Sequence, residues 1–219
     1  DENMTGLIID LRDNPGGLLN SAVDILDMFI DQGETLVWTA GKTRRSHRKY
    51  KSKSVPIIPN DINFAVLINQ GSASASEIVS GVIQDLDRGV VIGRPSFGKG
   101  LVQTVYKIDR ERSLKITTAK YFIPSGRLIQ KPGYLPEDIL ADTSGQDTLF
   151  ETSGGRTVTG GGGISPDYHV TLDPSGPILS ACYRGGVFFS FVQKNKHFYD
   201  TFDNVESDSS LIYLGLHLF

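Results

Sequence analysis

AVLINQGSASASEIVSGVIQDLDRGVVIGRPSFGKGLVQ, residues 65–103, is the most informative stretch of the sequence. It opens with an apolar run, Ala65 to Ile68, that stops at a polar Gly-Ser turn. A helical pattern begins at about Ser74, and a short β-branched run follows at residues 90–92. The apolar stripe of the helix consists of Ile78, Val79, Val82, Ile83 and Leu86. The spacing therefore predicts a strand, a turn, a helix and a second strand.

A similar strand-turn-helix unit lies near the start of the chain. Residues 6–11, GLIIDL, form a compact apolar run that suits a strand buried on both faces of a parallel sheet. The turn RDNPGG at residues 12–17 follows, and its glycines leave backbone amides uncovered by side chains. Apolar residues then recur at helical spacing from Leu19 to Ile30, with Gly33 as the expected end of the helix.

The remaining pattern is shorter and more polar. Two extended segments are expected at residues 34–40 and 43–53, and the second is polar enough to lie at a sheet edge or in a flap. Residues 101–108 and 113–122 predict a hairpin. Further expectations are a flexible or tightly turning connection at 160–163, a short strand within 164–172, and a helix over 177–199 weakened by Gly185 and Gly186. No element is assigned after that helix.

Composition excludes several classes of protein. The 219 residues carry a formal net charge of −3 and the pI is near 5.8, so no overall positive charge attracts nucleic acid or anionic lipid. The basic run from Arg44 to Lys53 is interpreted as the solvated face of a strand rather than as a binding patch. We therefore expect no nucleic acid among the partners.

Metal and thiol chemistry are poorly supported. Cys182 is the single cysteine and cannot form an internal disulfide, and the four histidines lack the spacing of a zinc site. We therefore expect no metal and no cofactor. No run approaches the roughly 20 apolar residues of a membrane helix, and no charged-then-apolar leader opens the chain. Because residue 1 is an aspartate rather than a methionine and an apolar strand begins at Leu7, we expect the chain to be a piece of a longer protein.

Ser74 can be interpreted in two ways. Ser-Ala-Ser-Glu at residues 74–77 fits a capping box, in which the serine oxygen and Glu77 satisfy amides at the helix start. The same position places a hydroxyl at the positive end of a helix dipole, where a developing oxyanion is stabilised. The two roles are geometrically compatible. Ser72 and Ser76 remain alternatives, because the pattern does not choose among the three serines.

Lys99 lies between two glycines and is the candidate base. A lysine partly removed from water between apolar strands favours its neutral amine, which accepts a proton from a serine. A phosphate-binding or solvent-facing lysine is the alternative, although the glycines match no P-loop pattern. In an extended segment Gln103 would point to the same side as Lys99, where its amide could orient the amine.

Five motifs resemble those of the carboxy-terminal processing peptidases and follow the order of that family. They are LIIDLRDNPGG (7–17), NQGSASASEIVSG (69–81), GRPSFGKGLVQ (93–103), KYFIPSGRLIQ (120–130) and GGGGISPD (160–167). The resemblance extends over residues 5–167, roughly three quarters of the chain. It implies an α/β fold of the ClpP/crotonase type, with a strand-strand-helix core, and a serine endopeptidase that cleaves proteins near their carboxyl ends.

The resemblance also implies a Ser/Lys dyad and an oxyanion hole made of backbone amides. The implied residues are Ser74 as nucleophile, Lys99 as general base, Gln103 as its support, and the amides of Ala75 and of Gly16 or Gly17. The implied reaction proceeds through an acyl-enzyme and cleaves after small or apolar residues. Its substrate would be a protein or peptide bound by its carboxyl-terminal tail.

The same resemblance sets expectations for the organisation of the protein. Residues 1–172 would form a protease core that is incomplete at its N-terminus, and residues 173–219 a C-terminal segment of unassigned structure. A PDZ domain, which usually precedes this core in the family, is missing here and would belong to the parent chain. The expected location is the bacterial cell envelope or periplasm, and a homo-oligomer is compatible with the sequence.

Two other functions share this fold class. A non-catalytic module that binds apolar ligands would not need a serine and a lysine together, so their joint presence argues against it. An acyl-CoA enzyme of the crotonase type rests on fold analogy alone, and the sequence has no residue pattern that matches it.

Overall fold

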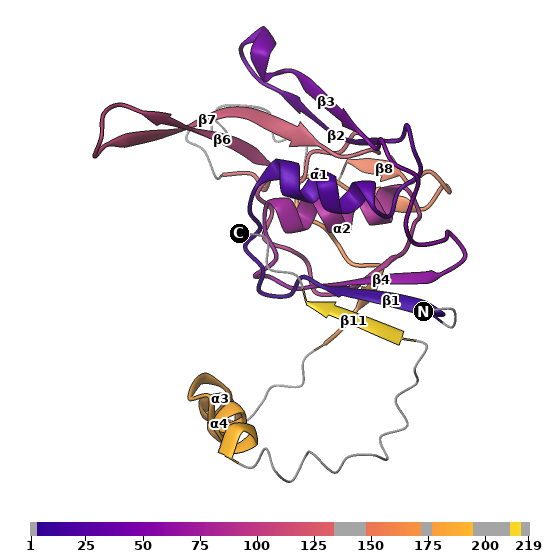
Figure 1. Cartoon of the computed structure of the whole chain (residues 1–219), viewed down its shortest axis with the longest axis vertical. Coiled ribbons are helices and arrows are strands. Elements are labelled where there is room, and N and C mark those ends of the chain that lie inside the picture. Colours follow the sequence, from indigo (N-terminus) through magenta and orange to yellow (C-terminus); the bar gives the residue numbers. More distant parts are fainter. Residues whose placement is uncertain (1–3, 134–147, 172–176, 195–210, 216–219) are drawn as a thin grey trace.

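The computed structural model describes residues 4–133, 148–171, 177–194 and 211–215, which include two larger sheets with helices between them (Figure 1). Within these ranges, one sheet has five parallel strands in the order β10-β5-β4-β1-β11. Its strands are β1 (Gly6–Asp10), β4 (Asn63–Ile68), β5 (Val90–Gly93), β10 (Tyr168–His169) and β11 (Leu211–Gly215). Helices connecting parallel strands are typical of an α/β protein, so the predicted α/β class is confirmed.

The other larger sheet is antiparallel and has the order β3-β2-β7-β6. Its strands are β2 (Thr35–Ala40), β3 (Arg48–Lys51), β6 (Leu101–Lys107) and β7 (Ser113–Phe122), with a 3-10 turn, η1 (Arg44–Ser46), between β2 and β3. The hairpin predicted over residues 101–122 is confirmed by the pairing of β6 with β7. The basic segment lies at the edge of this sheet, as predicted, because β3 is its outermost strand.

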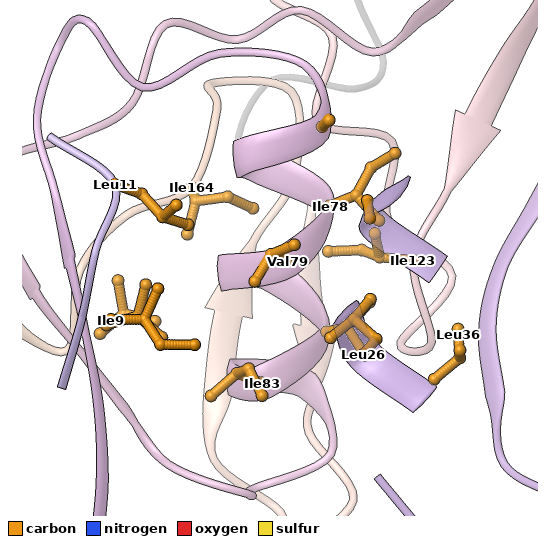
Figure 2. Packing of buried hydrophobic residues seen from close by; sticks show 14 of the residues in the cluster. Ile9, Leu11, Leu26, Leu36, Ile78, Val79, Ile83, Ile123 and Ile164 are labelled. Carbon is orange, nitrogen blue, oxygen red and sulfur yellow. The ribbon is translucent and has the colours of Figure 1, made fainter. Parts of the chain in front are cut away.

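Helices α1 (Leu19–Asp27) and α2 (Ala75–Asp85) pack together between the two sheets. Every residue of α2 is buried, because this helix has neighbours on all sides. Figure 2 shows Ile9 beside one flank of α2 and Leu26 of α1 beside the other. The apolar stripe predicted for α2 therefore forms the centre of the core.

The parallel pairing of β1 with β4 positions the turns that follow them. Parallel neighbours end at the same edge of a sheet, so residues 11–18 and 69–74 lie together there. Two hydrogen bonds join these segments: the Leu11 amide donates to the Leu67 carbonyl (2.9 Å), and the Ala73 amide donates to the Asn14 carbonyl (3.0 Å). Both predicted strand-turn-helix units therefore contribute to one edge.

Helix α1 has nine residues, which agrees with the predicted length of about three turns, but it ends at Asp27 and not at Gly33 as predicted. The carbonyl of Met28 accepts a hydrogen bond from the Ile57 amide (2.9 Å) instead of one from a further helical turn. Gly33 does not end the helix but lies in the following turn, with a φ of +93°. The helix thus ends early because the Met28 carbonyl is bonded to a residue from a distant segment. The sequence pattern does not reveal this contact.

One face of the parallel sheet is less covered than predicted. Helices α1 and α2 both lie on the same side of β1 and β4 (Figure 1). Ile9 and Val66 face these helices and are buried, whereas Ile8, Leu67 and Ile92 are only half-buried. The expectation of a strand buried on both faces is therefore wrong for the described part of the chain, which provides no second helical layer there.

The C-terminal third of the chain differs from its predictions in several details. The four glycines at 160–163 turn tightly and are held by backbone hydrogen bonds, which is the second of the two predicted forms. The predicted long helix is divided at Gly185 and Gly186 into α3 (Pro177–Arg184) and α4 (Val187–Lys194), and residues 195–199 lie outside the described residues. The hairpin of β8 (Leu149–Glu151) with β9 (Thr157–Thr159), and strand β11, were not predicted. The division of the chain at residue 172 stays a prediction.

Candidate active site

Ser74 lies immediately before the first turn of α2, and its backbone conformation is unusual. Its φ of 56° and ψ of −114° fall outside the regions that residues with a side chain normally adopt. A conformation of this kind costs about 1–3 kcal/mol and persists only where the surrounding structure imposes it. Ser74 and Glu77 have the reciprocal arrangement of a capping box, in which the serine side chain faces the Glu77 amide and the Glu77 carboxylate accepts the Ser74 amide. A capping oxygen acts only as an acceptor, so the hydroxyl proton of Ser74 is not used by the helix.

The two alternative serines have different surroundings. Ser72 is fully buried, and its hydroxyl donates to the Leu11 carbonyl (2.6 Å). Ser76 is also fully buried, and its hydroxyl donates to the Asn14 carbonyl (3.0 Å). Both hydroxyls thus hold the turn after β1 against the start of α2, whereas Ser74 is only half-buried. The geometry favours Ser74 where the sequence pattern left three serines open.

The structure brings the backbones of Ser74 and Lys99 together through Glu77. The amide of Ser74 donates to Glu77 Oε2 (2.8 Å), and the amide of Lys99 donates to the same oxygen (2.8 Å). Glu77 Oε1 accepts from the Ser96 hydroxyl (2.5 Å) and from the Gly98 amide (2.6 Å). One carboxylate therefore holds the start of α2 against the loop that carries the lysine.

Glu77 is completely buried, and its ionisation reflects two opposing effects. Burial raises the pKa of Glu77, because the charged form loses its hydration. The hydrogen bonds donated by Ser96, Lys99, Gly98 and Ser74 lower it, in that order, by stabilising the carboxylate. A buried charge is tolerated only where such partners replace water, so all four contacts are needed for this arrangement.

Tyr121, from β7, provides a second connection between the same two residues. Its hydroxyl contacts the carbonyl oxygens of both Ser74, at 3.1 Å, and Lys99. Burial raises the pKa of the Tyr121 phenol, and the nearby Glu77 carboxylate raises it further. The phenol therefore stays protonated and remains a hydrogen-bond donor. Glu77 thus accepts hydrogen bonds from the amides of Ser74 and Lys99, and the Tyr121 hydroxyl contacts the carbonyls of the same two residues.

The turn after β1 lies against Ser74 and exposes backbone donors there. A Cβ built on Gly16 would lie 2.7 Å from the Ala75 amide nitrogen and 3.0 Å from the Ser74 Cβ, so the two chains are in direct contact. The Gly16 amide donates to Asn14 Oδ1 (3.0 Å) and is therefore occupied. In the described part of the chain the amides of Gly17 and Ala75 have no hydrogen-bond partner.

Two unpartnered amides beside a serine hydroxyl at a helix N-terminus can stabilise a developing oxyanion. Of the two glycines that the sequence left open as donors, the hydrogen bonding of Gly16 leaves Gly17 as the available one. Ala75 is the first residue of α2, where amides have no intrahelical acceptor. The arrangement thus suits a reaction in which a carbonyl oxygen becomes negatively charged.

Gln103 lies in β6, four residues after Lys99, and is half-buried. It pairs with Thr117 of β7, next to an irregularity in the register of the two strands. Its side chain makes no hydrogen bond to another described residue. The role of Gln103 in orienting the lysine amine therefore stays a prediction.

Sequence reasoning missed three features of this site. Glu77 was interpreted only as a helix cap, although Ser96 and Gly98 could have suggested a second set of donors for it. Asn14 was treated as part of a turn, yet its side chain and carbonyl hold three donors. Tyr121 carries no local signal, because a tyrosine in a strand is ordinarily a core residue.

Neither metal binding nor a membrane span is indicated by the described residues. Within those ranges no group of three or more His, Cys, Asp and Glu side chains could hold a metal ion. No helix in the same ranges has the length and hydropathy needed to cross a bilayer.

Known proteins resemble this chain in sequence and in structure. The pattern of peptidase family S41 matches residues 1–140. The carboxy-terminal-processing protease of Bartonella bacilliformis is 42% identical over 139 residues, which cover 64% of this chain and 32% of that protein. The carboxyl-terminal-processing protease of a Picosynechococcus species is 37% identical over 133 residues, which cover 61% of this chain and 31% of that protein.

Among solved structures, the photosystem II D1 C-terminal processing protease superposes with a TM-score of 0.56 at 30% identity. The superposition covers 80% of this chain and 36% of that one. The chain spans about a third of the length of the curated relatives that it matches.

Proposed function

The chain belongs to peptidase family S41, and on this basis we propose that it acts as a serine endopeptidase with Ser74 as nucleophile and Lys99 as general base. The observation that carries the proposal is the double connection of the two backbones by Glu77 and Tyr121. A nucleophile and its base must stay within reach of one hydrogen bond. Two buried side chains that hold both backbones support that requirement.

In the acylation step the neutral amine of Lys99 takes the hydroxyl proton of Ser74 as the serine oxygen attacks the peptide carbonyl. The carbonyl oxygen becomes an oxyanion, which the amides of Ala75 and Gly17 stabilise. The Lys99 ammonium then gives its proton to the leaving amine, so the peptide bond breaks and an ester to Ser74 remains. Gln103 would orient the lysine amine during these transfers.

In the deacylation step a water molecule repeats the sequence. Lys99 takes a proton from the water, the resulting hydroxide attacks the ester carbonyl, and the same two amides stabilise the second oxyanion. The proton returns to Ser74 as the ester bond breaks. The dyad ends in its starting state.

The names of the relatives suggest the substrate. They are carboxyl-terminal processing proteases, so the proposed substrates are proteins cleaved near their carboxyl ends. Cleavage after small or apolar residues is proposed from the resemblance of the sequence motifs. The substrate would be bound by its carboxyl-terminal tail, and a PDZ domain of the parent chain would capture it. The proposed location is the bacterial envelope or periplasm, where such tails are accessible to a secreted protease.

The finer fold assignment is part of the same proposal. Two strand-turn-helix units whose turns meet at one sheet edge support a ClpP/crotonase-type core. In that arrangement the first turn supplies an oxyanion donor and the second supplies the nucleophile.

Peptide cleavage with matched variants tests the dyad. The substrate is a peptide with an apolar carboxyl end, and the variants are Ser74→Ala and Lys99→Ala. Each should lower kcat/KM by about a thousandfold or more, because members of a catalytic group act as a unit. Ser54→Ala and Lys115→Ala are the controls, since both residues are exposed, Ser54 bonds to Asp27, and Lys115 pairs with Val105 of β6. They should retain wild-type turnover.

Mass spectrometry of the chain during turnover should detect an acyl adduct on the peptide that contains Ser74. Equal turnover by wild type and Lys99→Ala would show that the lysine is not the base. Tight binding of an apolar ligand that survives Ser74→Ala, with no cleavage by wild type, would favour the non-catalytic binding module instead.

A further inference from the structure

Positive charge is concentrated on the antiparallel sheet. The segments 35–53 and 99–122, which contain β2, β3, β6 and β7, carry thirteen of the 22 Lys and Arg residues of the chain. Only two of the 25 acidic residues, Asp109 and Glu111, lie in the same segments. A protein with a net charge of −3 therefore has one strongly positive region.

Part of this positive region lines a groove. The groove has a volume of about 1020 Å³ and lies between the start of α1 and the two hairpins β2–β3 and β6–β7. Its basic lining residues are Lys42, Arg44, Arg45 and Arg48. Leu18, Val102 and Ala119 contribute apolar surface, and no acidic residue lines it.

The basic run of the sequence is divided between two environments. Because side chains alternate along a strand, Arg48 and Tyr50 of β3 line the groove, whereas Lys49 and Lys51 do not. The four basic groove residues are exposed and form no ion pair within the described part of the chain. Their charges are thus available to a bound anion.

Two lining residues of the groove follow residues of the candidate active site closely in the sequence. Leu18 follows Gly17, whose amide has no partner in the described ranges. Val102 follows Lys99 by three residues, at the start of β6. We therefore expect a peptide whose carbonyl lies at the Ser74 hydroxyl and the amides of Gly17 and Ala75 to extend past Leu18 into the groove on one side of the cleaved bond.

We propose that this groove binds acidic side chains of the substrate next to the bond that is cleaved. This inference rests on the proposed peptidase function and adds a preference to it. A peptide fits better than a polynucleotide or a lipid headgroup, because apolar side chains line the groove together with the charges and the lining includes Leu18, the residue after Gly17. Opposite charges at such a rim raise the rate of association and select partners.

Paired peptides test the preference. There are two pairs of peptides, and every peptide has an apolar residue at the cleaved bond. The two members of a pair differ only in that one carries three glutamates and the other three glutamines. These residues lie before the cleaved bond in one pair and after it in the other. The glutamate peptide of one pair should have a kcat/KM about five- to tenfold higher at low salt, since several exposed ion pairs each contribute modestly. The ratio should fall to about twofold at roughly 0.5 M salt, where such pairs are screened.

Two triple variants with the same change in charge locate the effect. Arg44→Gln, Arg45→Gln and Arg48→Gln together remove groove charges and should reduce the glutamate-to-glutamine ratio to about one. Lys49→Gln, Lys51→Gln and Lys53→Gln together remove charges of the same segment that do not line the groove. This second variant should keep most of the preference. Equal losses in both, or a ratio near one in wild type, would overturn the proposal.

Binding separates this inference from the peptidase proposal. With Ser74→Ala, fluorescence anisotropy measures the affinity for each labelled peptide without cleavage. If wild type cleaves neither peptide but the glutamate peptide binds more tightly through the groove arginines, the peptidase proposal fails and the acidic subsite stands. Equal binding of both peptides overturns the subsite. Tighter, arginine-dependent binding of duplex DNA, or of phosphatidylcholine vesicles containing phosphatidylserine, would overturn the choice of a peptide.

Discussion

Glu77 combines a local and a long-range role in one side chain. As the third residue of α2 it accepts the Ser74 amide, which the sequence pattern predicts. It also accepts donors from Ser96, Gly98 and Lys99, about twenty residues away in the sequence. The local role follows from a spacing of three residues, whereas the long-range role follows from how the loop after β5 (Val90–Gly93) packs on α2.

Replacing Glu77 with glutamine should loosen the site. A glutamine has one acceptor oxygen, and its NH₂ group would face amides that are themselves donors. We expect Glu77→Gln to lower the free energy of unfolding by about 2–3 kcal/mol, because buried donors lose their acceptor. Peptidase activity should fall about a hundredfold from displaced catalytic groups. Denaturant titration and kcat/KM measure the two effects, and Glu34→Gln, at an exposed position, is the control.

The pH dependence of stability gives a second readout for Glu77. Burial raises the pKa of its carboxyl above the ordinary range, so the folded chain binds this proton more tightly than the unfolded chain. The resulting stabilisation is present below the ordinary carboxyl pKa and is lost as pH rises through the raised value. The Glu77→Gln chain should lack this decline. A wild-type curve with the same slope as the variant would contradict the assignment.

At the scale of elements, two turns build the site. The turns at residues 12–17 and 69–74 each carry the glycine and polar residues that predict a turn. Their adjacency depends on β1 and β4 being parallel neighbours, which bring both turns to one sheet edge. The buried side chain of Asn14 then fixes the first turn by accepting the Gly16 amide.

Gly16→Ala should disrupt the contact between these turns. Gly16 has a φ of +86°, and an added Cβ would lie 2.3 Å from the Ala73 carbonyl oxygen, so the turn must move. Moving it displaces the Gly17 amide, and loss of one oxyanion donor lowers kcat by about a hundredfold or more. The measurement is kcat on the apolar peptide.

Gly33→Ala is the matched control for that substitution. Gly33 has a similar φ of +93°, but an added Cβ would meet nothing within 4 Å. This variant should lose about 1–2 kcal/mol of stability from backbone strain alone and keep its activity. Equal losses of activity in both variants would show that strain, rather than the contact with Ser74, explains the effect.

At the scale of the whole molecule, a buried ion pair connects separate parts of the chain. Arg127 and Asp85 are both fully buried, with 2.8 Å between Arg127 Nη2 and Asp85 Oδ1. Arg127 also donates to Gln84 Oε1 (2.6 Å) and to the Thr159 carbonyl (3.0 Å). Burial raises the pKa of Asp85 and lowers that of Arg127, and each partner's charge opposes the shift of the other.

Arg127→Met should be among the most destabilising single substitutions. It leaves the Asp85 carboxylate buried without its counter-charge, which costs about 3–5 kcal/mol. Arg112→Met is the control, because Arg112 forms an exposed ion pair with Asp109, with side-chain exposures of 76% and 39%. Its loss should cost less than about 1 kcal/mol. Thermal or denaturant unfolding compares the two, and similar losses would contradict the assigned role of the buried pair.

Much of the architecture follows from the pattern of residues. The structure agrees with five predictions: the α/β class, the strand-turn-helix units, the buried stripe of α2, the hairpin of residues 101–122 and the edge position of β3. The resemblance to carboxy-terminal processing peptidases is confirmed by the family match. These features depend on periodicity and turn residues, which are local properties of a sequence.

Other features depend on contacts between distant residues. The early end of α1 follows from a carbonyl that is bonded elsewhere, and β11 pairs with β1 from about two hundred residues away. The ordered glycine turn at 160–163 and the half-buried face of the parallel sheet also depend on neighbours that no periodicity describes.

The stretch from Ala65 to Gln103 thus specified a strand, a capped helix and a lysine between glycines, because spacing and turn chemistry act over a few residues. Ordered motifs added the family and the candidate pair of Ser74 and Lys99. The three-dimensional arrangement agrees with the motifs on Ser74, because the Ser72 and Ser76 hydroxyls are bonded to backbone carbonyls. It alone left Gly17 rather than Gly16 with an unpartnered amide. These distinctions rest on which hydrogen bonds are already satisfied, and such bonds form between segments that only folding brings together.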